Sequence, residues 1–165
     1  MTQQPWWRNA VIYQVYVRSF ADGNGDGAGD LIGLLEHLDY IASLGVDGVW
    51  LNPCYPSPQM DHGYDVSDYF NIEPTYGDLD IFDQLITRAN KLGLRILMDV
   101  VPNHCSDQHA WFTEAVAAGR GSKERERFWF RDGQGVDGEL PPNNWKAVFG
   151  GGAWSHVLPG SYTHQ

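Results

Sequence analysis

The sequence contains little cysteine and little positive charge. Its only cysteines, Cys54 and Cys105, lack the spacing of metal ligands, so no disulfide framework is predicted and free thiols in a reducing compartment are expected. Lys and Arg number 11 against 21 Asp and Glu in 165 residues, which gives a net charge of −10. Because an acidic chain without a basic stripe repels phosphate backbones, nucleic acid is not an expected partner.

Long apolar runs are also missing. No run approaches the roughly 18 residues of a membrane span, and residues 1–7 lack the charged start and apolar core of a signal peptide. We therefore expect no membrane partner and a cytoplasmic location. Aromatic residues, in contrast, are plentiful, with seven Trp, eight Tyr and seven Phe. They can form core, or they can bind carbohydrate, because flat apolar sugar faces stack on aromatic rings.

The first part of the chain predicts a β-α-β-α-β order. Runs of β-branched and aromatic residues predict strands at 11–17, 46–51 and 94–101. Leu and Ile at three- and four-residue spacing predict two helices, one from Asp30 to Gly45 and one from Asp78 to Gly93. This order predicts an α/β fold with a parallel sheet and right-handed crossovers.

The connections differ in length on the two sides of this predicted sheet. Helices lead into strands through short turns, whereas the strands lead into helices through the long loops 18–29 and 52–77. Long loops at the carboxyl ends of parallel strands are typical of a functional face. After His104 the pattern changes: Asp107 is expected to cap a short helix, and the Gly-, Pro- and Trp-rich residues 131–160 predict an irregular excursion.

The first long loop predicts a cation site, because oxygen-bearing side chains alternate with glycines. The candidate ligands are Asp22, Asn24, Asp26 and Asp30, together with the carbonyl oxygen of Ala28. Glycines let the backbone wrap tightly, and hard oxygen ligands suit Ca²⁺. The acidic side chains and the lack of a G-x-G-x-x-G motif disfavour a phosphate cradle. The alternative is a solvated Gly-Asp turn.

The second long loop and the end of the third strand predict one shared cleft. The loop places Asp61 and Tyr64 around the bend that Gly63 permits, and the strand ends in Asp99 with His104 five residues later. Carboxylates, an imidazole and a phenol ring suit the hydroxyls and flat faces of sugars. The alternatives are an acidic surface loop and hydrogen-bonded polar residues without a ligand.

Several segments together resemble the α-amylase family of glycoside hydrolases (family 13). They are Ala10–Tyr16, Asp22–Asp30, Gly63–Asp65 and Asp99–His104. The segments 7–10 and 141–154 are similar to those of bacterial α-glucosidases and oligo-1,6-glucosidases. Val17, His62 and Cys105 depart from the common family pattern without touching a motif residue.

The resemblance implies a partial TIM (β/α)8 barrel. Residues 1–104 would supply its first three strands, and residues 105–165 would begin an inserted domain B. By the family pattern, the subsite for the non-reducing glucose is lined by Asp61, Tyr64 and His104 and supported by Asp99. The implied ligands of a structural Ca²⁺ are Asp22, Asn24, Asp26, Ala28 and Asp30.

The implied activity is that of a retaining α-glucosidase, which hydrolyses terminal α-linked glucose from short α-glucosides. In the family, the nucleophile and the acid/base follow later strands, beyond Gln165, so no catalytic residue is assigned within this chain. The 165 residues alone are therefore expected to be inactive without the remainder of the barrel. Two alternatives stay open: a trehalose synthase-type α-glucosyl isomerase, and an inactive fragment that binds only calcium or sugar.

Overall fold

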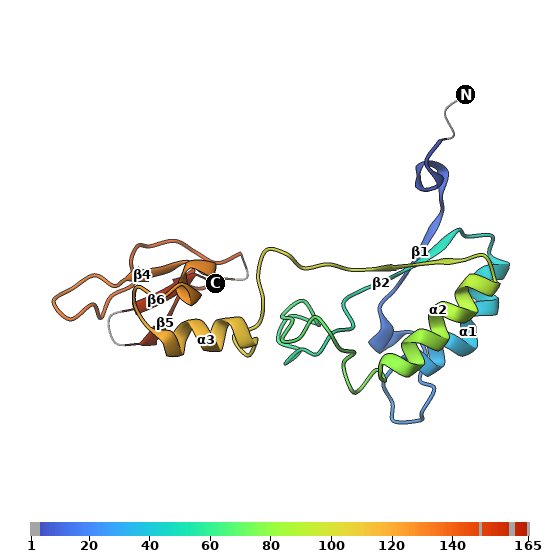
Figure 1. The fold of residues 1–165 in the computed structure, drawn as a ribbon, viewed down its shortest axis with the longest axis horizontal. Coiled ribbons are helices and arrows are strands. Elements are labelled where there is room, and N and C mark those ends of the chain that lie inside the picture. The colour runs from blue at the N-terminus through green and yellow to red at the C-terminus, as the bar shows by residue number, and fades with distance from the viewer. Residues whose placement is uncertain (1–3, 149, 159–160, 165) are drawn as a thin grey trace. The chain divides into compact units, whose positions relative to one another are not determined.

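The computed structural model describes residues 4–148, 150–158 and 161–164. The chain divides into two compact units, Met1–Ser106 and Asp107–Gln165, each with its own three-stranded sheet (Figure 1). Within the described residues, no helix has the length and apolar character that crossing a membrane requires.

The first unit contains the predicted parallel sheet, with its strands in sequence order. The strands are β1 (Ile12–Val15), β2 (Gly48–Leu51) and β3 (Arg95–Met98), and helices α1 (Leu31–Ser43) and α2 (Leu79–Lys91) connect them. The strands are shorter than predicted. After β1 the chain turns into a 3-10 helix at Val17–Ser19. The carbonyl oxygen of Arg18 in this helix accepts from the Gly29 N–H across the first loop at 2.7 Å.

Strand register places the core on one face of this sheet. Val15, Leu51 and Met98 pair across the three strands and pack toward the helices. The helices contribute fully buried residues at helical spacing, namely Leu31, Leu34, Leu38 and Ile41 of α1 and Leu85 and Ala89 of α2. The opposite face carries Gln14 and Trp50, which pair with each other and are exposed.

Both predicted helix starts are confirmed. Asp30 and Asp78 are extended residues whose carboxylates accept from the third residue beyond, at 2.7 Å and 2.9 Å. The helices end before Gly45 and Gly93, which have φ values of 75° and 77°. This left-handed conformation favours glycine and turns the chain directly into the following strand.

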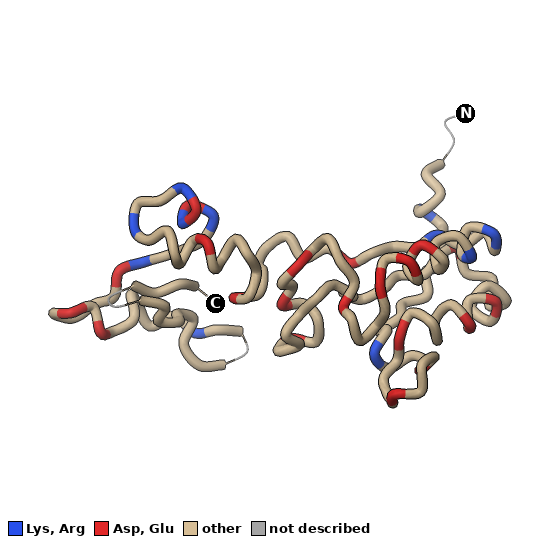
Figure 2. The backbone as a smooth tube through the Cα atoms, turned by 60° about the horizontal axis from the view of Figure 1, so that its bottom comes forward, with Lys and Arg blue, Asp and Glu red and all other residues tan. Residues whose placement is uncertain are grey.

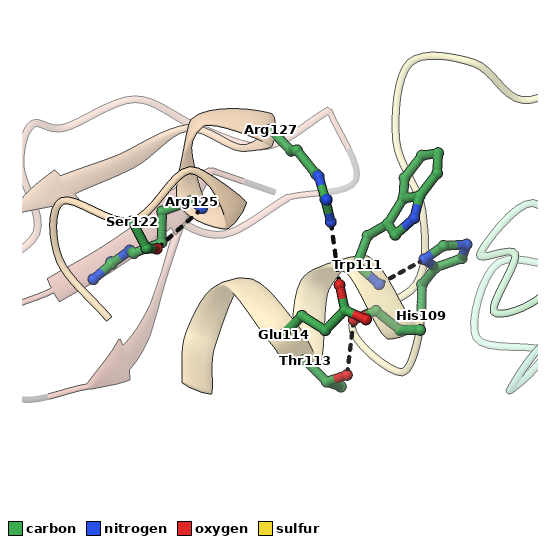
Figure 3. A network of polar contacts seen from close by, with 8 residues as sticks. His109, Trp111, Thr113, Glu114, Ser122, Arg125 and Arg127 are labelled. Atoms are coloured by element: carbon green, nitrogen blue, oxygen red, sulfur yellow. Dashed lines mark hydrogen bonds and ion pairs between the residues drawn. The ribbon is translucent and has the colours of Figure 1, made fainter. Parts of the chain in front are cut away.

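The second unit differs from the sequence prediction in two ways. Helix α3 (Ala110–Ala118) has its N-cap at His109, two residues after the predicted Asp107: the His109 Nδ1 accepts from the Trp111 N–H at 3.1 Å (Figure 3). Residues 131–160 were predicted to be irregular, but they contribute to an antiparallel sheet. Its strands are β4 (Phe130–Asp132), β5 (Trp154–Leu158) and β6 (Ser161–His164), in the order β4-β6-β5.

A buried arginine organises the interior of the second unit. Arg125, only 7% exposed, donates to the Ser161 hydroxyl at 2.6 Å and lies 3.9 Å over the ring of Phe130. The Phe130 ring stacks on Phe112 of α3, which links the helix to the sheet. The 3-10 helix Glu124–Arg127 is tied to α3 as well, through an ion pair between Arg127 and Glu114 (Figure 3).

The two helix caps predict different costs on removal. The buried Asp30 carboxylate accepts not only from Gly33 but also from the N–H groups of Gly23 and Asn24, each at 3.1 Å. Loss of an exposed cap such as Asp78 costs about 1 kcal/mol. Asp30→Ala also leaves two further N–H groups without a charged acceptor, so we expect a loss on the order of 3 kcal/mol.

Urea unfolding of the native protein and the two variants measures this difference in unfolding free energy. The comparison holds where the slope of unfolding free energy against urea concentration is the same for all three proteins. Equal losses for Asp30→Ala and Asp78→Ala would show that the bonds from Gly23 and Asn24 add nothing.

Candidate functional site

Three strand ends are joined by hydrogen bonds at the carboxyl edge of the first sheet. The Tyr64 hydroxyl, from the loop after β2, donates to Asp99 Oδ2 directly after β3 at 2.9 Å. Asn52, directly after β2, donates through Nδ2 to the Tyr64 hydroxyl oxygen at 3.1 Å. Gln14 of β1 donates through Nε2 to Asn52 Oδ1 at 2.9 Å. Four polar side chains thus form one continuous line across the edge.

His104 is held against the same tyrosine. Its Nε2 lies 3.0 Å from the carbonyl oxygen of Tyr64, and its Nδ1 lies 2.9 Å from Asn103 Nδ2. Because a carbonyl oxygen can only accept, Nε2 donates to Tyr64 in this arrangement. The imidazole is therefore held through both ring nitrogens at an exposed position.

Asp61 belongs to the turn that presents Tyr64. Its carbonyl oxygen accepts from the Tyr64 N–H at 3.0 Å, and its side chain is half-buried. Gly63, between them, has a φ of 99°, and a Cβ there would meet the Pro53 carbonyl oxygen at 3.0 Å. The predicted glycine-dependent bend is confirmed. The structure thus brings Tyr64, Asp99 and His104 together and places Asp61 in the adjoining turn.

The surroundings of Tyr64 keep its hydroxyl protonated. Burial raises its pKa first, and the hydrogen bond to the Asp99 carboxylate raises it further. The hydroxyl donates to Asp99 and accepts from Asn52, so both of its hydrogen-bonding roles are filled inside the protein. Tyr64 is half-buried, so part of its side chain stays accessible beside these bonds.

The segment after β3 is held by two further tyrosines that sequence reasoning missed. The Tyr55 hydroxyl donates to the Asp99 carbonyl at 2.9 Å, and the Tyr69 hydroxyl contacts the carbonyl oxygens of Val101 and His104 at 2.7 Å and 3.0 Å. Sequence reasoning also left out Gln14 and Asn52. Asn52 could have been predicted as a site residue, because it is a polar residue directly after a strand, as Asp99 is.

The loop proposed to bind calcium is shaped by its own backbone. The Asp22 carboxylate accepts from Gly25 at 2.6 Å and from Gly27 at 2.8 Å, and Asp26 accepts from Ala28 at 2.8 Å. The N–H groups of Gly27 and Gly25 lower the pKa of Asp22. Across the described residues, no three His, Cys, Asp or Glu side chains gather as metal ligands. The oxygen types suit Ca²⁺, and their convergence on an ion stays a prediction.

Charge in the first unit is strongly one-sided. Residues 4–106 contain 14 Asp and Glu but five Lys and Arg, and Figure 2 shows acidic positions along most of their length. Several of these carboxylates are held by neutral donors. Asp65, for example, accepts from the Ser57 hydroxyl at 2.6 Å and the Met60 N–H at 2.8 Å. Although burial raises the pKa of Asp65, these bonds outweigh it and the pKa is lowered.

A parallel sheet with polar side chains at the carboxyl ends of its strands is the layout of an α/β-barrel enzyme. A family model described as "Alpha amylase, catalytic domain" matches residues 14–160. The chain belongs to the α-amylase family, as its motifs predicted.

The relatives include a trehalose-6-phosphate hydrolase and an oligo-1,6-glucosidase. Trehalose-6-phosphate hydrolase of Escherichia coli (strain K12) is 54% identical over 155 residues, which cover 93% of this chain and 27% of that protein. Oligo-1,6-glucosidase of Bacillus sp. (strain F5) is 48% identical over 160 residues, covering 95% of this chain and 30% of that protein. The chain thus spans less than a third of the length of these relatives.

Solved structures confirm the predicted fold class, the first three strands of a TIM barrel. A mutant of trehalulose synthase MutB superposes with a TM-score of 0.90 at 46% identity, over 99% of this chain and 29% of that one. Trehalose-6-phosphate hydrolase of Bacillus licheniformis gives a TM-score of 0.91 at 43% identity, over 98% of this chain and 29% of that one.

The lowered pKa of Asp65 predicts a pH dependence of stability. The unfolded carboxyl takes up its proton at a higher pH than the folded one. The stability that Asp65 contributes is therefore present above its unfolded pKa and lost as pH falls through the folded pKa. Between about pH 5 and about pH 3, we expect the native protein to lose more unfolding free energy than Asp65→Asn.

Denaturant unfolding at each pH measures this, with Ser57→Ala as the matched control. That variant removes the Ser57 bond to the Asp65 carboxylate and keeps the Met60 bond, so its pH dependence should lie between those of the native protein and Asp65→Asn. If the unfolding free energies of the native protein and Asp65→Asn fall in parallel with pH, the lowered pKa of Asp65 is contradicted.

Proposed function

We propose that the protein carrying this chain is an α-glucosidase, which hydrolyses terminal α-linked glucose from short α-glucosides. The observation that carries this proposal is the bonded group of Tyr64, Asp99 and His104 at the carboxyl edge of the sheet, with Asp61 in the adjoining turn. Membership of the α-amylase family and the glucosidases among its relatives support the same substrate class.

The chemistry of the group suits a neutral sugar. Carboxylate oxygens of Asp61 accept hydrogen bonds from sugar hydroxyls, and the Tyr64 ring offers a flat apolar surface. Bonds to the terminal glucose that strengthen as its ring flattens toward an oxocarbenium ion lower the barrier. A retaining glycosidase also needs a nucleophile and an acid/base about 5 Å apart. We assign neither to residues 1–165 and place both in the remainder of the barrel.

A second candidate is hydrolysis of trehalose 6-phosphate, which the named relatives of Escherichia coli and Bacillus licheniformis favour. That reaction also releases a terminal α-linked glucose, so the residues proposed here would serve both. The difference lies in the leaving sugar, which bears a phosphate. An isomerase, favoured by the likeness to trehalulose synthase, differs in transferring the glucosyl group to a sugar and not to water.

Steady-state kinetics on the intact protein tests the proposal, with maltose, isomaltose, sucrose and trehalose 6-phosphate as substrates. We expect glucose release from the short α-glucosides, and a kcat/KM lower by about a hundredfold or more in Asp61→Ala, because the contact strengthens in the transition state. Asp83→Ala, on the exposed face of α2, is the matched acidic control and should retain full activity.

Three results would redirect the assignment. Activity confined to trehalose 6-phosphate favours the second candidate, and rearranged disaccharides without free glucose favour the isomerase. An unchanged kcat/KM in Asp61→Ala removes Asp61 from the site.

We also propose that the loop Asp22–Asp30 holds a structural Ca²⁺ through Asp22, Asn24, Asp26, Asp30 and the carbonyl of Ala28. The acids supply the hard oxygen ligands that this ion prefers. Backbone N–H bonds already shape the loop, so calcium has to recruit the remaining lone pairs of the same oxygens. The ion would stabilise the loop before α1 and take no part in the reaction.

Calcium is therefore expected to raise the melting temperature of the chelator-treated protein in a concentration-dependent way, because a ligand that binds only the folded state stabilises it. Asp26→Ala, exposed and outside the α1 cap, should abolish the shift while leaving the calcium-free melt close to native. A melt that is identical with calcium and with chelator would refute the site.

A further inference from the structure

The side chain of Asn52 lies between two strand ends and the tyrosine of the site. It follows β2 directly, and its backbone N–H continues the ladder by donating to the Val15 carbonyl at 3.0 Å. Backbone pairing therefore fixes where its Cα lies. Its amide then reaches Gln14 on one side and Tyr64 on the other.

The line of hydrogen bonds can run in only one direction when Asp99 is ionised. A carboxylate only accepts, so the single hydroxyl proton of Tyr64 must point to Asp99 Oδ2. The phenol oxygen then needs a donor on its other side, and Asn52 Nδ2 is that donor. Its Oδ1 consequently faces Gln14, whose Nε2 donates to it. The negative charge on Asp99 therefore determines how the side-chain amides of Asn52 and Gln14 are oriented.

We propose that Asn52 is a positioning residue for the glucose subsite. By donating to the Tyr64 hydroxyl oxygen, it keeps the hydroxyl proton directed at Asp99 Oδ2 and restrains the position of the Tyr64 side chain. Gln14 keeps the Asn52 amide turned the right way. The proposal rests on the function proposed above, because it assigns Asn52 a role in the same site.

The test compares Asn52→Asp with Asn52→Ala in the intact protein. Asn52→Asp keeps the shape and the acceptor for Gln14 but replaces the donor facing Tyr64 with a carboxylate oxygen. One hydroxyl proton then serves two carboxylates, so near pH 7 we expect kcat/KM to fall by about tenfold or more. Protonation of the introduced carboxyl restores a donor, so the loss relative to native protein should shrink as pH falls toward about 5.

The other titratable groups around the position are Asp61, Tyr64, Asp99 and His104. Asn52→Ala keeps all four and adds no charge, so its kcat/KM relative to native protein is the reference against which the pH dependence of Asn52→Asp is compared. Asn52→Ala lacks the donor at every pH, so its loss should not depend on pH. A ratio for Asn52→Asp that is flat across this range, or an Asn52→Ala with native kcat/KM, would overturn the proposal.

A readout without activity separates this proposal from the proposed function. If the native protein releases no glucose, the proposed function fails, and unfolding measurements then decide the role of Asn52. The Asn52→Asp substitution should lower the melting temperature less in a protein that carries Tyr64→Phe than in the native protein. The reason is that Tyr64→Phe removes the hydroxyl that the introduced carboxylate would face. Equal decreases in the two backgrounds would show that Asn52 does not act through the Tyr64 hydroxyl.

Discussion

The in-register parallel pairing of β1, β2 and β3 is the constraint on which the first unit depends. It aligns Val15, Leu51 and Met98, so that each strand ends at the same level. The ladder then continues for one more bond, from the Asp99 N–H to the Leu51 carbonyl at 3.1 Å. Because all three strands end at one edge of the sheet, polar residues that are distant in sequence meet there.

The loops at this edge are ordered mainly by side-chain bonds to backbone groups. Tyr55 and Tyr69 each donate a hydroxyl to carbonyl oxygens of the segment after β3, whereas Asp30 and Asp65 accept from backbone N–H groups of the other two loops. Such bonds satisfy backbone groups that a loop cannot pair within itself. The loops can therefore be long and still hold fixed positions for the residues of the site.

The sequence predicted what depends on local pattern and missed what depends on distant partners. Helices α1 and α2 and their aspartate caps follow from spacing and cap chemistry within one segment. The bond between Tyr64 and Asp99 joins residues 35 positions apart, so sequence could suggest the cleft but not the bond. The second sheet was missed for the same reason: its strands have three to five residues, and Phe130 pairs with Thr163. Periodicity cannot be read over so few residues.

The acidity of the first unit has a consequence for the kind of ligand it suits. Among the ion pairs of the described residues, one lies in this unit, between Arg88 and Asp39 on the helices. The carboxylates near the strand ends are held by neutral donors, as Asp99 is by the Tyr64 hydroxyl and Asp65 by Ser57. A guanidinium would occupy both oxygens of a carboxylate and compete with a sugar hydroxyl for them. Neutral donors leave lone pairs on these oxygens, and a ligand rich in hydroxyl groups is the kind that such a surface can recognise.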